Sequence, residues 1–154
     1  MAPMVAELER VGFTDVGTIA QSGNVLVTTD RDARGTARAV EEAVLASSGT
    51  VTVAVPIHGE ELREVLEVVA LPAVLDPSRV LCVVMDREPP AGAGADLDRL
   101  DPGRTELIGR IVVQQCPDGV SKAPSVVALV ERHWGMKATA RNLRMIGRIV
   151  AGLG

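Results

Sequence analysis

The front part of the chain alternates between helical and strand-like patterns of apolar residues. Apolar positions at helical spacing predict a first helix over residues 3–11, with Gly12 as its stop. Residues 14–20 and 25–29 have strand character and are separated by a turn, Gln21-Ser22-Gly23-Asn24. A helix capped by Asp30 or Asp32 is expected to run to Ser47, and the β-branched stretch 50–55 predicts another strand. This order is a ferredoxin-like βαββαβ pattern without its first strand.

The remaining residues mix helices and strands again. A helix is expected over residues 59–71, ended by Pro72, followed by an almost wholly apolar strand over 79–85 that should be buried on both faces. Residues 88–95, rich in Pro, Ala and Gly, predict a loop, and 105–108 and 110–115 predict two strands. Pro124 should open a helix that reaches Trp134, and Thr139 should cap a last helix. We therefore expect an α+β fold: one domain over 1–154, or two lobes of about 1–57 and 58–154.

Composition narrows the class of protein. The chain has 154 residues with one Phe, one Trp and no Tyr, so the core must be aliphatic. The aromatic platforms on which single-stranded nucleic acids stack are almost absent, which argues against nucleic-acid binding. No apolar run is long enough to cross a membrane, and the N-terminus does not have the pattern of a signal peptide. Cys82 and Cys116 lack metal-ligand or redox spacing, and together these features predict a cytoplasmic protein.

Charge is distributed unevenly along the chain. The net charge is −4, yet the stretch from Lys122 to the end has six basic residues and one acidic residue. Such asymmetry is typical of an anion-binding end, and equally of two lobes that attract each other.

Three segments resemble, in this order, a bacterial family called domain of unknown function 1697. They are residues 12–25, with Gln-Ser-Gly-Asn-Val as the most specific piece, residues 117–122 and residues 138–142. Members of that family usually open with a strand and a loop of the type Leu-Arg-Gly-Ile-Asn-Val-Gly-Gly, which is absent before this chain's first helix. The family also usually has a Trp where this chain has Leu143. The resemblance implies a fold and a set of marked positions, but no reaction and no cofactor.

The absent strand bears on how the front half can fold. In a ferredoxin-like sheet the first strand is central, so its loss would expose two sheet edges to pairing or aggregation. A misassigned start codon is the simplest account, and the upstream coding sequence would test it.

Ser121 and Lys122 form the first candidate site. They precede the helix expected at Pro124, and backbone N–H groups at a helix N-terminus favour anions. The segment lacks the spacing of a Walker A loop. The alternative is that Ser121 is a helix cap and Lys122 a solvated side chain.

Arg141 and Asn142 form the second candidate site, and Gln21, Ser22 and Asn24 the third. Arg141 would lie in the first turn of the last helix, where the helix dipole disfavours a cation unless an anion pairs with it. A solvated basic face on that helix is the alternative. Gln21, Ser22 and Asn24 could orient a ligand, although a tight hairpin also explains the segment.

The sequence leaves three hypotheses about function. The first is a protein that binds a phosphorylated small molecule through Gln21, Asn24, Ser121, Lys122 and Arg141. The second is a non-enzymatic interaction module, with exposed sheet edges that pair with a second copy or with another protein. The third is an enzyme, for which no catalytic residue can be named: His58 and His133 have no local partners. No metal site is expected, because Asp96, Asp98 and Asp101 lack the spacing of a calcium loop.

Overall fold

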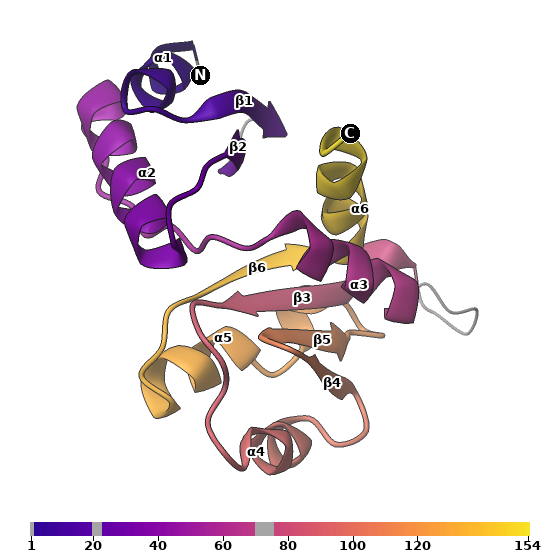
Figure 1. The fold of residues 1–154 in the computed structure, drawn as a ribbon. Coiled ribbons are helices and arrows are strands. Elements are labelled where there is room, and N and C mark those ends of the chain that lie inside the picture. The colour runs from indigo at the N-terminus through magenta and orange to yellow at the C-terminus, as the bar shows by residue number, and fades with distance from the viewer. Residues whose placement is uncertain (1, 20–22, 70–75) are drawn as a thin grey trace. The chain divides into compact units, whose positions relative to one another are not determined.

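The computed structural model describes residues 2–19, 23–69 and 76–154. The described chain divides into two compact units (Figure 1), and each is treated below by itself. Unit 1 comprises residues 1–56 and 151–154, and unit 2 comprises residues 57–150. Both contain helices and antiparallel sheet, which confirms the α+β class.

Unit 1 is built from two helices and a two-stranded antiparallel sheet. Its elements are α1 (Ala2–Arg10), β1 (Thr14–Ile19), β2 (Asn24–Thr28) and α2 (Ala33–Ser48). Asp32 caps α2 by accepting a hydrogen bond from the N–H of Gly35, and Gly49 ends the helix in a left-handed conformation. The predicted order helix, strand, strand, helix is therefore confirmed.

The core of unit 1 is small. Its cluster of buried apolar residues consists of Leu8, Phe13 and Ala43, with partly buried aliphatic residues packed around them. A two-stranded sheet needs such packing, because an isolated hairpin is marginally stable in water. Helices α1 and α2 supply much of it.

The prediction of a strand over residues 50–55 is wrong. This segment belongs to no helix or strand, although five of its six residues are Val or Thr. The β propensity of such residues reflects packing against neighbouring strands and is not an intrinsic backbone preference. Among the described residues no strand pairs with the segment, so its composition alone does not make it a strand.

Unit 2 contains the complete ferredoxin-like order that was predicted, in part, for the front half. Its elements are α3 (Gly59–Val69), η1 (Pro77–Arg79), β3 (Val80–Met85), α4 (Ala93–Leu100), β4 (Thr105–Ile108), β5 (Ile111–Gln115), η2 (Val120–Lys122), α5 (Val126–Ala128), η3 (Leu129–His133), β6 (Ala138–Asn142) and α6 (Leu143–Gly152). From β3 to β6 the strands and the two connecting helical segments read βαββαβ. Helix α6 continues into the last residues of unit 1.

The four strands of unit 2 form one antiparallel sheet in the order β4-β5-β3-β6 (Figure 1). The central strand, β3, pairs with β5 on one side and with β6 on the other. It is buried on both faces, as its apolar sequence predicted.

One buried cluster of unit 2 lies where β3 and β5 meet the two connecting helical segments. Its buried residues are Val83, Met85, Leu97, Val112, Val126, Val130 and Met136. Helix α4 contributes Leu97, and the segment of α5 and η3 contributes Val126 and Val130. Unit 2 thus has a larger apolar core than unit 1.

Three sequence predictions for unit 2 need correction. Helix α4 begins inside the predicted loop 88–95, so Asp96 and Asp98 lie on a helix. The helix expected at Pro124 begins at Val126, with Ser125 as its cap. The last helix is not capped by Thr139, which lies in strand β6, but by Asn142. Backbone pairing with β3 overrides the local capping pattern around Thr139.

Candidate functional site

Asn24 is the one residue of the predicted hairpin site that can be placed. Gln21 and Ser22 lie outside the described residues. The side chain of Asn24 is buried, and its Nδ2 donates a hydrogen bond to the carbonyl oxygen of Ile19 at 3.2 Å. This bond lies beside the backbone pair of Ile19 and Asn24, where β1 and β2 meet.

Ser121 and Lys122 lie in the short 3₁₀ helix η2, and both are exposed. Within the described parts of the chain, neither side chain has a hydrogen bond or an ion pair. The interpretation of Ser121 as a helix cap is wrong, because Ser125 performs that role by accepting a hydrogen bond from the N–H of Ala128. The two side chains are thus exposed polar groups ahead of the helix start.

Arg141 and Asn142 both have structural partners. Nη1 of Arg141 donates to Oγ1 of Thr139 and to the carbonyl oxygen of Ala140, each at 2.8 Å. Oδ1 of Asn142 accepts a hydrogen bond from the N–H of Met145 at 2.8 Å and so caps α6. Arg141 lies in a strand, so the interpretation of a cation placed against a helix dipole is wrong for it.

The segment with Ser121 and Lys122 and the segment with Arg141 and Asn142 lie at the same end of the sheet of unit 2. Leu81 of β3 is opposite Asn142 on one side and opposite Gln114 on the other. Two strand spacings put the Cα atoms of Asn142 and Gln114 about 10 Å apart. Residues 116–122 continue from that end of β5, and Nη1 of Arg79 holds them by donating to the carbonyl oxygen of Pro117 at 2.7 Å. The end of the sheet at Leu81 therefore carries both η2 and the start of α6.

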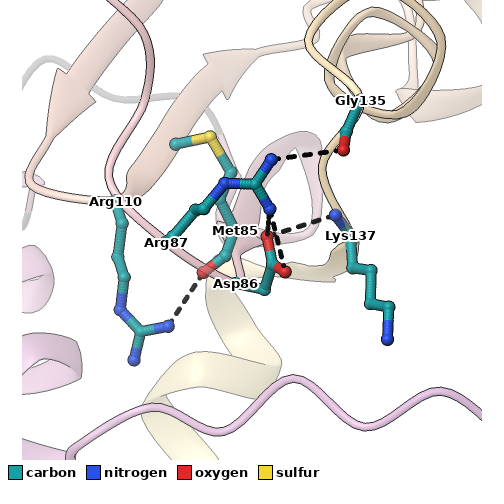
Figure 2. A network of polar contacts seen from close by, with 6 residues as sticks. All are labelled: Met85, Asp86, Arg87, Arg110, Gly135 and Lys137. Atoms are coloured by element: carbon teal, nitrogen blue, oxygen red, sulfur yellow. Dashed lines mark hydrogen bonds and ion pairs between the residues drawn. The ribbon is translucent and has the colours of Figure 1, made fainter. Parts of the chain in front are cut away.

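The opposite end of β3 carries a network of polar contacts that the sequence did not indicate. Figure 2 shows the Asp86 carboxylate accepting hydrogen bonds from Arg87 and from the backbone N–H of Lys137. Arg87 also donates to the carbonyl oxygen of Gly135 at 3.3 Å. These bonds fasten the chain after β3 to the chain before β6, which is a structural role.

Arg110 joins three elements of unit 2. Its side chain is 11% exposed, donates to the carbonyl oxygen of Met85 at 2.8 Å (Figure 2) and contacts both carboxylate oxygens of Glu61, at 3.4 and 3.1 Å. Burial alone would raise the pKa of Glu61, but the hydrogen bond and charge of Arg110, with the backbone N–H of His58, outweigh it and hold the pKa below its usual value. The pair therefore links α3 to the sheet electrostatically.

A second buried polar group lies at the edge of the core of unit 2. Gln114 is fully buried, and its Nε2 donates to Oδ2 of Asp101 at 2.9 Å and to the carbonyl oxygen of Pro124 at 3.0 Å. Its Oε1 has no hydrogen-bond partner within the described structure. The amide ties the end of α4 to the segment before α5.

Cys82 and Cys116 are both free and buried. Burial raises the pKa of the Cys82 thiol to about 12 and also raises the pKa of Cys116, so neither forms a thiolate readily. Across residues 2–19, 23–69 and 76–154, no group of three or more His, Cys, Asp or Glu side chains could hold a metal ion. In the same ranges no helix is long and apolar enough to span a membrane.

The feature that sequence reasoning missed is the exposure of residues 50–55, which we call the valine segment. Val51 is 85% exposed and Val53 is 58% exposed, whereas Thr52 and Ala54 are partly buried. This is the reverse of the usual pattern, in which the apolar face of an alternating segment is turned inward. The alternation itself was visible in the sequence, but it does not tell which face meets solvent.

A family model described as "Protein of unknown function (DUF1697)" matches residues 1–112. No curated protein and no solved structure matches the chain.

Proposed function

We propose that this chain, which belongs to the DUF1697 family of proteins of unknown function, is an interaction module that binds a partner by strand pairing. The valine segment is the surface through which it does so. One observation carries this proposal: apolar, β-branched side chains face solvent along a stretch with no strand partner among the described residues. Unpaired strand edges are templates for strand addition, and the valine segment would become such a strand when it pairs.

The backbone of the valine segment supports the same proposal. The N–H of Ala54 donates to Oε1 of Glu41 at 3.0 Å, and the N–H of Thr50 donates to Oγ of Ser48 at 3.3 Å. Among the described residues, Val51, Val53 and Val55 have no backbone hydrogen bond. Backbone groups of alternate residues in a strand point to the same edge. In the paired strand that we propose, the edge with Thr50 and Ala54 would therefore face α2, and the other edge would be open to a partner strand.

A labelled peptide tests this function. A fluorescein-labelled peptide with the sequence of residues 49–57 is titrated with the protein, and binding is followed by fluorescence anisotropy. The protein should bind the peptide, because main-chain hydrogen bonds supply much of the affinity in strand addition. The double variant Val51→Lys/Val53→Lys should not bind, because two charges would then lie on the paired face.

The matched control is Val68→Lys, which places the same substitution at another exposed valine, on α3. It should bind the peptide as the unmodified protein does. Equal binding by the double variant, or no binding by the unmodified protein, would overturn the proposal.

A second function, binding of a phosphorylated small molecule, is favoured by one observation only. Ser121 and Lys122 are exposed, adjacent and without side-chain partners in the described structure. Arg141 and Asn142 support it less, because their side chains are engaged in holding β6 and α6.

A thermal-shift assay tests this second function with inorganic pyrophosphate, nucleotides and sugar phosphates as probes. A ligand at 100 times its Kd should add about 2.7 kcal/mol to the free energy of unfolding. The shift should be lost in Lys122→Ala and kept in Lys137→Ala, a control at another exposed lysine. A flat response to all probes, or equal shifts in both variants, would contradict it.

We further propose that the protein acts in the cytoplasm.

A further inference from the structure

We infer that the partner of the valine segment is a second copy of the same segment, paired antiparallel about a two-fold axis at Val53. This inference rests on the proposed function and adds the identity of the partner and the register of the contact.

Charge and composition make the segment compatible with itself. Residues 49–58 contain no Asp, Glu, Lys or Arg, so two copies can pair without placing like charges opposite each other. Proteins usually protect open strand edges with charged residues or an early Pro, and here the first Pro is Pro56, beyond the segment. Nothing in the segment therefore opposes self-pairing.

Side-chain alternation restricts the register. Opposite residues of an antiparallel pair project to the same face, so valines of both copies share a face only when odd-numbered residues are opposite odd-numbered residues. A two-fold axis at Val53 satisfies this condition and pairs all three valines, with Val53 opposite Val53 and Val51 opposite Val55, whereas an axis at Thr52 would pair only Val51 with Val53. Such cross-strand pairs of β-branched residues are favourable. A shift by one residue would put valines of the two copies on opposite faces.

Backbone direction is compatible with the same register. The open edge carries the N–H and C=O groups of Val51, Val53 and Val55, because those of Thr50 and Ala54 are directed toward α2. In the pair centred on Val53 these three residues are the hydrogen-bonded positions on both strands. The backbone argument agrees with every register that places odd-numbered residues opposite each other, and the number of valine pairs selects the one centred on Val53.

The size of the contact predicts its strength. Two six-residue strands bury less than the roughly 1,200 Å² of a stable complex. We therefore expect a concentration-dependent dimer that dissociates on dilution.

Sedimentation and cysteine cross-linking test this inference. The unmodified protein should shift from monomer to dimer as its concentration rises, and Val51→Lys/Val53→Lys should remain a monomer. Under a mild oxidant such as diamide, Val53→Cys should form a cross-linked dimer, because opposite Cα atoms in a hydrogen-bonded pair are about 5.5 Å apart, within disulfide reach. Thr52→Cys should cross-link far less, because its own copy lies two residues out of register. Cys82 and Cys116 are buried and should not interfere.

Each further outcome overturns a defined part of the inference. A dimer that cross-links through Thr52→Cys but not Val53→Cys would overturn the register. A chain that binds the peptide of residues 49–57 yet stays monomeric at every concentration would overturn the second copy as partner and leave the proposed function standing. A protein that stays monomeric and also fails to bind the peptide would overturn both the second copy as partner and the proposed function.

Discussion

The contact between Glu61 and Arg110 allows a prediction of how acid affects the stability of unit 2. The perturbation is Glu61→Gln, which removes the negative charge and leaves Arg110, at 11% exposure, with its bond to Met85. A hydrogen bond between charged groups contributes about 1.5–3 kcal/mol in buried sites. The Glu61 side chain is 38% exposed, so solvent screening reduces the expected loss to about 1 kcal/mol at pH 7.

The sign of the pH dependence follows from the direction of the pKa shift. The pKa of Glu61 is lowered from 4.5, so its contribution is present above that value and is lost as the pH falls through the lower pKa of the folded protein. The difference between the unmodified protein and Glu61→Gln should therefore be full at pH 7 and should shrink below pH 4.5.

Urea unfolding followed by tryptophan fluorescence measures this difference. Trp134 is the only tryptophan of the sequence and lies in unit 2, so its signal reports on the unit that contains the pair. The control is Glu60→Gln, which removes a charge from the same first turn of α3 and so includes the same helix-dipole effect. An effect of Glu61→Gln that persists undiminished at low pH, or that equals the effect of Glu60→Gln at pH 7, would show that the contact with Arg110 does not stabilise unit 2.

Three further predictions concern unit 2. Asn142→Ala should lower the free energy of unfolding by about 1 kcal/mol through loss of the α6 cap, and Asn142→Asp should not; urea unfolding would reveal an error if both variants behave alike. Gln114→Met should lower the free energy of unfolding by about 1–2 kcal/mol, because Asp101 and the carbonyl of Pro124 lose their hydrogen-bond donor. The substitution also removes the unpaired Oε1. A variant more stable than the unmodified protein would show that removing this unpaired acceptor outweighs the loss of the donor. Cys82 should react with a thiol reagent at pH 8 only after unfolding, because burial raises its pKa to about 12, and rapid labelling of the folded protein would contradict this.

Helix caps, helix stops and apolar runs predicted most of the secondary structure, because these short-range features determine where such elements begin and end. The cap at Asp32 and the stop at Gly49 set the bounds of α2, and the short apolar run 80–85, rich in Val, forms the buried strand that its composition favoured. Where the sequence misled, tertiary pairing decided the outcome. Thr139 has the chemistry of a helix cap but pairs with Val84 across the sheet, and α4 forms within a stretch whose Pro and Gly content suggested a loop.

The candidate sites show the limit of sequence reasoning more sharply. Arg141 and Asn142 were selected as polar groups near a helix start, but neighbouring backbone and side-chain atoms take up the hydrogen bonds described above. Such bonds depend on the fold and cannot be read from residue types. The valine segment was predicted as a strand, but only the structure reveals that Val51 and Val53 face solvent.

In the proposed complex the valine segment pairs with another strand through its open edge. The most direct test is amide hydrogen exchange of residues 50–55, measured by NMR at low and high protein concentration. The amides of Val51, Val53 and Val55 should become protected as the concentration rises, while that of Thr52 should not. Exchange rates of these three valines that stay the same at every concentration, although the peptide of residues 49–57 is also present in excess, would contradict it.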